Sequence, residues 1–499
     1  MSPSGGRRVA VVWYRRDLRV HDHAALSAAV ARADAVVPLF VLDDRLLAAG
    51  REAPDRVAFM LASASALAAD LATRGAQLVV ALGDPRRIVR AVAAGADAAA
   101  VHVTRDTGPY GTARDAAVAA ALAEDGRALV AWPGLTVHEP EEMRTREGRA
   151  YAVHGPFARR WAAAPPAPLL PAPARVPGPE ADLVTRLVAD PGAAGATALV
   201  AGQRAARLLA DLVPPDASAR DVPAPGEAAA RARLERWVGD GLARYAAGRD
   251  RLGVDATSRL SQDLRWGLLS PSEVRVRAEA AGAGEDGRVF VSELSWRDFY
   301  LHARAAFPAF ASGPYRAAAD RVPWRDDADG LAAWRDGRTG FPVVDAAMRQ
   351  LAATGWMHNR ARMIVASFLV KDLLVDWRLG ERHFLRLLVD GDLASNAGGW
   401  QWIAGCGPDP QPWFRILDPV AQGRRHDPDG AYVRQWVPEL AALPARWIHA
   451  PWTAPDHEAR AAGVRLGRDY PAPIVDRRMT RHRALAAYRS ARTAFPPSG

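Results

Sequence analysis

The segment Gly340–Trp402 decides the fold of the C-terminal half, and it reads GFPVVDAAMRQLAATGWMHNRARMIVASFLVKDLLVDWRLGERHFLRLLVDGDLASNAGGWQW. Asp345 is suited to begin a helix and Gly355 to end it. Helical patterns then run from about Met357 to Leu374 and from about Glu381 to Val389. The segment therefore predicts three consecutive helices.

Polar side chains interrupt this otherwise apolar segment. Asn359, Arg362 and Met363, with Ala366 one turn later, share one face of the second helix. The third helix leads into an Asp-Gly-Asp sequence and a predicted turn at Gly398-Gly399. Taken singly, each of these residues is also typical of a core or of a helix end. Together they predict a planar polar ligand, because buried polar groups need partners. The candidates are Asn359, Arg362, Asp390, Asp392 and Asn396.

Composition bounds the class of protein. With 499 residues, two domains or more are expected, and 49% apolar with 24% charged residues is typical of a soluble globular chain. Apolar runs break before about 18 residues, which predicts no transmembrane helix, and the lack of a signal-peptide core predicts a cytoplasmic location. Cys406 is the only cysteine, so no disulfide is expected. The Asp-x-Asp sequence lacks the rest of a calcium loop, so no metal is predicted.

The net charge of +9 favours a polyanionic partner such as nucleic acid. Lys371 is the only lysine, so nearly all basic residues are arginine. That bias is also explained by the base composition of the genome. The charge by itself therefore leaves the partner open.

The N-terminal residues 1–132 alternate between strands and helices. Continuous apolar strands in this pattern predict a parallel, doubly wound sheet covered on both faces. No glycine-rich fingerprint follows the first strand, which argues against a nicotinamide cofactor. The predicted strands are 8–14, 36–42, 77–82, 98–103 and 128–131, with helices at 55–73, 85–94 and 112–123.

Residues 133–225 are rich in Pro, Ala and Gly, and periodic patterns thin out. This composition predicts a long interdomain connection that is partly ordered at best. Helical periodicity resumes near Glu227 and predicts an all-helical domain at 226–490.

Two further motifs suit nucleotide chemistry. In YAAGRDRLGVDATSRLS (245–261), hydroxyls of Thr257, Ser258 and Ser261 stand before a helix, where free backbone N–H groups attract phosphate. A simple helix cap is the alternative. In ELSWRDFY (293–300), Glu293, Trp296 and Arg297 share a helix face, so the indole could stack on a base and the cation reach a phosphate. The alternative there is an amphipathic helix with an internal ion pair.

These motifs resemble the photolyase/cryptochrome family, nearest the class I enzymes that repair cyclobutane pyrimidine dimers. The resemblance runs almost end to end and in family order. Its motifs are WYRRDLRVHDHAAL (13–26), TSRLS (257–261), ELSWRDFY (293–300), GWMHNRARM (355–363), DGDLASNAGGWQW (390–402) and FRILDP (414–419).

The resemblance implies an α/β antenna domain followed by an all-α domain that holds FAD. Asn396 would face flavin N5, where plant cryptochromes of the family carry Asp, and Asp392 would lie near the pyrimidine edge of the ring. The implied FAD-binding residues are Tyr245, Thr257, Ser258, Arg259, Leu260, Ser261, Phe290, Arg362, Asp390, Gly391, Asp392 and Asn396.

The resemblance also implies an electron path and a substrate face. Trp400, Trp377 and Trp324 match the tryptophans that pass electrons inward to reduce FAD. A flipped-out dimer would meet Glu293, Trp296, Asn359, Met363 and Trp402, with Glu293, Asn359, Met363 and Asn396 as catalytic residues. The implied DNA contacts are Arg249, Arg297, Arg360, Arg415 and Gln422.

The implied activity is light-driven repair: excited FADH⁻ donates an electron to the dimer in UV-damaged DNA, the cyclobutane ring splits, and the electron returns. The family's base flipping belongs to the same expectation. A monomer without an obligatory protein partner or membrane is expected. The alternatives are a cryptochrome-like photoreceptor, a six-four photolyase and an unrelated basic flavoprotein.

Two stretches depart from the family pattern. Tyr-x-Val-Phe-Thr-Pro-Phe appears here as Tyr151–Phe157, YAVHGPF, with His154 in place of the first Phe. Folate-binding members place Asn-Glu where this chain has Tyr110-Gly111. The loop is more similar to members that bind 8-hydroxy-5-deazaflavin, so that antenna is favoured over methenyltetrahydrofolate, and an empty antenna site is the third alternative.

Overall fold

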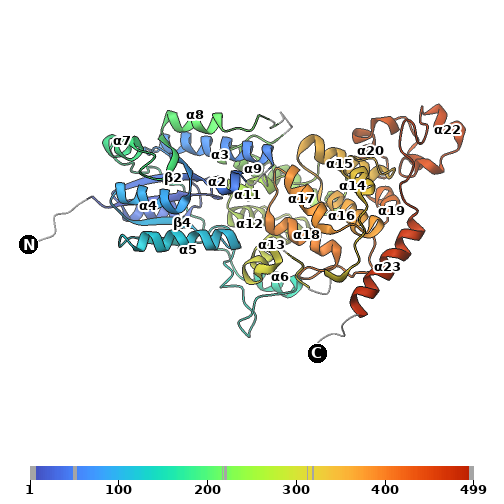
Figure 1. Cartoon of the computed structure of the whole chain (residues 1–499), viewed down its shortest axis with the longest axis horizontal. Helices are drawn as coiled ribbons and strands as arrows, with labels where there is room; N and C mark the ends of the chain where they lie inside the picture. The colour runs from blue at the N-terminus through green and yellow to red at the C-terminus, as the bar shows by residue number, and fades with distance from the viewer. Residues whose placement is uncertain are drawn as a thin grey trace, which may run out of the picture.

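The computed structural model describes residues 7–48, 53–215, 217, 222–311, 313–316 and 320–493. An N-terminal α/β domain and a C-terminal helical domain lie side by side (Figure 1). Their apolar cores are continuous, because one buried cluster contains Val12 and Tyr14 of the sheet together with Phe290 and Phe299 of the helical domain.

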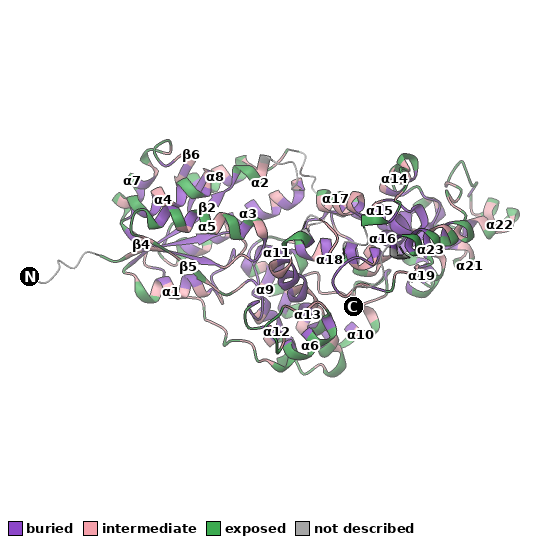
Figure 2. Ribbon diagram, turned by 60° about the horizontal axis from the view of Figure 1, so that its bottom comes forward, coloured by how far each residue is buried: buried purple, intermediate pink, exposed green. Residues whose placement is uncertain are grey.

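A six-stranded sheet forms the N-terminal domain, in the order β5-β4-β1-β2-β3-β6. The five predicted strands are present and pair in parallel, and their central members are buried on both faces (Figure 2). The predicted doubly wound sheet is therefore confirmed. The elements are β1 Val9–Tyr14, α1 Ala24–Arg32, β2 Ala35–Leu42, α2 Asp44–Ala48, α3 Pro54–Thr73, β3 Val79–Gly83, α4 Pro85–Gly95, β4 Ala98–Thr104, α5 Pro109–Ala123 and β5 Ala128–Trp132.

The described part of residues 133–225 is more ordered than predicted. The strand β6 (Ala196–Ala201) joins the sheet antiparallel to β3. Backbone bonds also fix the proline-rich part, since Asp22 N–H donates to Leu170 and Val36 N–H to Pro177. Composition conceals this order because partners distant in sequence supply the hydrogen bonds. The helices here are α6 His154–Ala163, α7 Ala181–Ala189 and α8 Gln203–Asp211.

The helix α3 is long and apolar enough to cross a membrane, which the sequence reading did not anticipate. Half of its most apolar window is buried inside the protein. It also carries Arg56, whose side chain is buried against the helical domain. These features are those of a core helix.

The described part of residues 226–493 forms helices and no sheet strand, which confirms the predicted all-α domain. The α-helices are α9 Glu227–Arg236, α10 Tyr245–Gly248, α11 Ser261–Trp266, α12 Pro271–Ala280, α13 Gly284–Ala306, α14 Ala328–Arg335, α15 Pro342–Thr354, α16 Asn359–Ser367, α17 Trp377–Leu387, α18 Leu393–Ala404, α19 Pro419–His426, α20 Ala431–Trp436, α21 Ala445–Ile448, α22 Asp456–Ala461 and α23 Arg477–Thr493. Shorter turns are η1 Trp237–Gly241, η2 Leu242–Arg244, η3 Pro308–Ala311, η5 Phe368–Leu373, η6 Pro438–Leu440 and η7 Pro451–Thr453.

Several helix boundaries differ from those predicted. The helix α15 begins at Pro342, and the Asp345 carboxylate instead accepts hydrogen bonds from Thr339, Gly340 and the Tyr470 hydroxyl. Gly355 does end it, with φ of 65°. The second predicted helix is α16 followed by the wider turn η5, and the third, α17, begins four residues earlier than predicted.

The glycine pair at 398–399 lies inside α18 and is not a turn. Gly398 is buried where α18 crosses α13, and a Cβ there would overlap the ring of Tyr300. Gly399 is exposed, and a Cβ there would meet nothing within 4 Å. The first glycine permits the close approach of two helices that the sequence pattern could not reveal.

Gly398→Ala should lower the free energy of unfolding by roughly 1–3 kcal/mol, because the added methyl group overpacks the α13–α18 contact. The matched control Gly399→Ala should leave it unchanged or raise it by up to about 1 kcal/mol, since Ala favours a helix more than Gly does. Urea unfolding of both variants measures the difference. Equal stability of the two variants would contradict the close approach.

Candidate functional site

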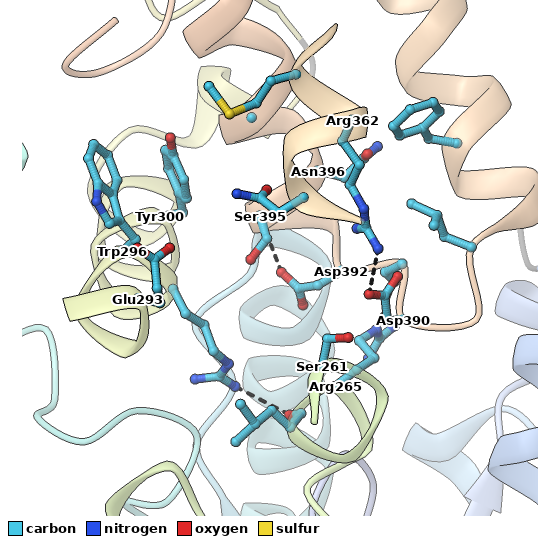
Figure 3. A pocket seen from close by; sticks show the side chains of 18 of the residues that line it. Ser261, Arg265, Glu293, Trp296, Tyr300, Arg362, Asp390, Asp392, Ser395 and Asn396 are labelled. Atoms are coloured by element: carbon cyan, nitrogen blue, oxygen red, sulfur yellow. Dashed lines mark hydrogen bonds and ion pairs between the residues drawn. The ribbon is translucent and has the colours of Figure 1, made fainter. Parts of the chain in front are cut away.

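A cavity of about 560 Å³ opens in the helical domain, within the size range of small-molecule sites. The helix α13 forms one wall and α16 another, and the floor is made by the loop 388–392 and the start of α11 (Figure 3). Most of the predicted ligand residues meet here. Those lining the cavity are Tyr245, Ser258, Leu260, Ser261, Phe290, Arg362, Asp390, Gly391, Asp392 and Asn396.

The predicted polar face of α16 is confirmed. Asn359, Arg362, Met363 and Ala366 all line the cavity. Ile364, on the opposite side of the helix, is buried in the core. The helical spacing read from the sequence therefore gave the correct orientation.

An ion pair joins α16 to the floor. The Arg362 Nη2 atom lies 2.8 Å from Asp390 Oδ2, and its Nε donates to the Met357 carbonyl. Asp390 is buried, and its Oδ1 atom has no hydrogen-bond partner among the residues that the structure describes. Because a buried carboxylate oxygen needs a donor, this atom fits a ligand that offers an N–H group.

Asp392 is a second carboxylate of the floor. Its Oδ1 accepts the N–H groups of Ala394 and Ser395 and thereby caps α18, and its Oδ2 lies 2.6 Å from Arg16 Nη2. Burial alone would raise the pKa of Asp392. The nearby guanidinium groups, Arg16 first and then Arg265, instead hold that pKa well below its usual range.

Asn396 is fixed by its amide nitrogen, which donates to the Glu381 backbone carbonyl at 3.1 Å and to its carboxylate at 3.3 Å. Burial raises the pKa of Glu381. With the nitrogen engaged behind it, the Asn396 amide oxygen remains for a ligand in the cavity.

The segment 257–261 presents alternate residues to two different spaces. Ser258 and Leu260 line the main cavity. Thr257 and Arg259 line a smaller pocket beside it, and the Arg259 guanidinium lies 4.3 Å from the centre of the Trp356 ring. That Thr257 and Arg259 also contact the cofactor stays a prediction, because they line the adjoining pocket. The backbone turns within this segment, since Arg259 has a left-handed φ of 49°.

The α13 wall carries Glu293, Trp296 and the unpredicted Tyr300, which Figure 3 shows on one side of the cavity. Arg249 Nη2 lies 2.7 Å from Glu293 Oε1, so two residues predicted to meet substrate and DNA pair with each other in this structure. The ring of Tyr245 meets Phe290 edge-on, with centroids 5.4 Å apart.

The prediction that Arg297 contacts DNA does not fit its position. Its guanidinium is turned inward and donates to the carbonyls of Leu135 and Leu264. Arg360 forms a bidentate pair with Asp250, at 2.9 Å. Arg415 is exposed and Gln422 half-buried, and both lie outside the cavity. Their contact with DNA stays a prediction.

The three tryptophans of the predicted electron path lie in neighbouring parts of the core. Trp400 is 2% exposed and forms part of the cavity wall. Trp377 is buried in the same apolar cluster, and Trp324 lies at its edge against Tyr488, with ring centroids 6.1 Å apart. Trp402 also lines the cavity.

Sequence reasoning missed several residues of the site. Arg16 comes from the N-terminal domain, and Arg265, Ser395 and Tyr300 come from helical elements. Arg16 belongs to a motif used for the resemblance, yet nothing local indicates its contact with a residue 376 positions later. Only tertiary folding brings that pair together.

The predicted antenna loop lies at the carboxyl ends of the strands. The Tyr110 hydroxyl donates to Asp43, and the Arg114 guanidinium lies over the rings of Trp13 and Tyr110. Gly111 packs against Asp106 so closely that a Cβ would overlap its carboxylate. Which chromophore binds there, if any, stays a prediction. Among the described residues, no cluster of three or more His, Cys, Asp or Glu side chains suits a metal ion.

Comparison with known proteins matches both domains. The family model for DNA photolyase covers residues 10–177, and that for the FAD binding domain of DNA photolyase covers 290–490. The deoxyribodipyrimidine photo-lyase of Streptomyces griseus is 42% identical over 94% of this chain and 96% of its own length. That of Escherichia coli K12 is 37% identical over 97% of this chain and 98% of its own.

Solved structures agree with these relatives. A class III photolyase from Agrobacterium tumefaciens superposes with a TM-score of 0.89 at 37% identity, covering 98% of this chain and 99% of that one. A Synechocystis cryptochrome gives 0.82 at 28% identity, covering 98% and 100%. Because the first of these is described as class III, the class I assignment stays a prediction.

His154 gives the α13 wall of the cavity a pH dependence. Its ring stacks on Trp296, with centroids 3.6 Å apart, and burial lowers its pKa to about 4. The unfolded chain takes up this proton near pH 6.5, which the folded chain resists, so stability should fall as the pH drops from about 6.5 to about 4. Between pH 7 and pH 5, the free energy of unfolding measured in urea should fall less in His154→Phe than in the wild type.

The control for this comparison is His457→Phe, which removes an exposed imidazole. It should retain the wild-type pH dependence. If His154→Phe also retained it, the imidazole would not be held neutral against Trp296.

Proposed function

The chain belongs to the DNA photolyase family, and we propose that it is a deoxyribodipyrimidine photo-lyase that uses FAD and light to split cyclobutane pyrimidine dimers in DNA. The observation that carries this proposal is that polar residues suited to a flavin nucleotide and an aromatic wall line the same cavity. Asp390 and Asp392 form the floor with Asn396 beside it, and Trp296 and Trp402 line the same cavity.

The residues of the floor fit FAD. The unpartnered Asp390 oxygen and the Asn396 amide oxygen are acceptors for ring N–H groups, and Ser258 and Ser261 offer hydroxyls where α11 begins. Arg362 is held by Asp390, so its guanidinium has a fixed direction. When bound and reduced, FAD would supply the electron that splits the dimer on illumination.

The remaining residues would bind the substrate and keep water out. The His154 ring stacks on the Trp296 indole and fixes its orientation for stacking on a pyrimidine. Glu293 is one-third exposed, so its carboxylate can exchange its pairing with Arg249 for a hydrogen bond to the flipped base. Arg249 would then be released to a DNA phosphate. Asn359 and Met363 complete the mouth on the α16 side.

The finer assignments belong to the same proposal. We assign DNA contact to Arg249, Arg360, Arg415 and Gln422, electron transfer to Trp400, Trp377 and Trp324, and the antenna, where present, to 8-hydroxy-5-deazaflavin. The domain limits 1–132, 133–225 and 226–490 are likewise proposed, with the middle segment folded onto the sheet. The chain is proposed to act as a cytoplasmic monomer.

The decisive experiment uses an oligonucleotide that carries one thymine cyclobutane dimer. Chemically reduced protein should restore the two thymines under near-UV or blue light and not in the dark. An oligonucleotide with a six-four photoproduct is the substrate control. No restoration of the cyclobutane dimer by protein with fully reduced FAD would reject the proposal and favour a photoreceptor, or a six-four enzyme if the control substrate is repaired.

Trp400→Phe should separate electron supply from repair. It removes the tryptophan at the cavity wall, so light-driven reduction of oxidised FAD should fall at least tenfold. Repair should persist when the flavin is reduced chemically. Trp132→Phe, in β5 of the α/β domain, is the control and should change neither rate. Equal loss of both activities in Trp400→Phe would contradict the proposed division of roles.

A further inference from the structure

Two arginines of the α/β domain contact the loop that forms the floor of the cavity. Arg56, on α3 of the α/β domain, donates its Nη1 to the Leu388 carbonyl at 2.6 Å. Arg16, which follows β1, donates its Nη2 to the Asp392 carboxylate at 2.6 Å. The two contacts bracket the loop 388–392, which carries three of the proposed flavin-binding residues.

The packing around this loop is built for both arginines. Arg56 is 1% exposed, and Gly391 leaves room for it, because a Cβ at 391 would overlap its guanidinium group. Arg265 supports the same loop from within the helical domain by donating its Nε to the Gly391 carbonyl at 3.0 Å. Backbone oxygens at 388 and 391 and the carboxylate at 392 are therefore each bound by an arginine.

Arg16 also determines the charge next to the cavity. It is the foremost of the cations that keep the pKa of Asp392 low. Its charge also acts on Asp106, a half-buried carboxylate just after β4: burial opposes ionisation there, and Arg16, followed by Arg15 and Arg114, lowers the pKa of Asp106. Arg15, the preceding residue, turns the other way and binds Asp115 and the Thr104 carbonyl at the carboxyl edge of the sheet.

We propose that Arg16 and Arg56 are positioning residues of the flavin site, supplied by the α/β domain. Together they fix the loop 388–392, and Arg16 additionally sets the charge and direction of the Asp392 carboxylate. This inference rests on the proposed binding of FAD in the cavity. It assigns the α/β domain a part in building the flavin site, separate from any chromophore of its own.

The two arginines should differ in what their loss changes. Arg56 contacts this loop through a backbone carbonyl, so its removal loosens the loop and leaves the charges carried by the loop itself unchanged. Arg16 neutralises a carboxylate beside the ring, so its removal leaves negative charge there and disfavours the anionic reduced flavin. Flavin affinity should fall in both cases, whereas the reduction potential should change only when Arg16 is lost.

The test titrates full-length apoprotein with FAD and measures the midpoint potential of the bound flavin. Arg16→Gln should weaken FAD binding at least tenfold and raise the ratio of oxidised to reduced flavin about tenfold at a fixed potential, which is about 30 mV for a two-electron couple. Arg16→Lys, which keeps the charge, should recover most of the potential. Arg56→Gln should weaken binding at least fivefold at an unchanged potential.

The control is Arg8→Gln, which breaks an exposed ion pair with Asp34 in the same domain and should change neither quantity. Wild-type affinity and potential in both Arg16→Gln and Arg56→Gln would overturn the inference. Weaker binding with an unchanged potential in Arg16→Gln would overturn its electrostatic part. If either Gln variant fails to fold, Arg16→Lys and Arg56→Lys test the positioning part alone, because they keep the charge and lose the guanidinium contact. Both should then weaken FAD binding, and wild-type affinity in both would overturn the inference. Failure of the wild type itself to bind FAD would reject the proposed function instead.

Discussion

A buried carboxylate needs compensating charge, and in this protein that need joins the two domains. Asp392 lies in the floor of the cavity, where burial opposes ionisation. Its charge is matched by Arg16 from the α/β domain and by Arg265 from the helical domain. The ion pair between Arg16 and Asp392 therefore depends on the packing of the two domains, and one apolar cluster spans both of them.

The shape of the cavity depends on where helices can approach each other. Gly398 lets α18 lie against Tyr300 on α13, and this contact sets the separation between the floor and the aromatic wall. Asn396 and Trp400 lie on the same helix as Gly398, so a residue without a side chain positions a ligand acceptor and a buried indole together. On the far wall, His154 supports Trp296 and is itself neutral because it is buried.

Part of the site was readable from sequence because local geometry governs it. The spacing of Asn359, Arg362 and Met363 predicted one helical face, and all three line the cavity. Asp392 was singled out among the polar residues, although its role as the cap of α18 was not. Arg297 was misjudged, because a helical face next to the substrate residues gives no sign that the guanidinium turns inward to backbone carbonyls.

The sequence by itself determined the alternation of strands and helices, the all-helical second half and the family, since periodicity and long motifs are local properties of the chain. Only the tertiary structure decided that 196–201 completes the sheet, that Thr257 and Arg259 face a second pocket, and that Arg16 and Arg56 support the loop 388–392. The physical reason is the same each time. A polar group is satisfied by whichever partner folding brings within about 3 Å, and sequence distance does not constrain that partner.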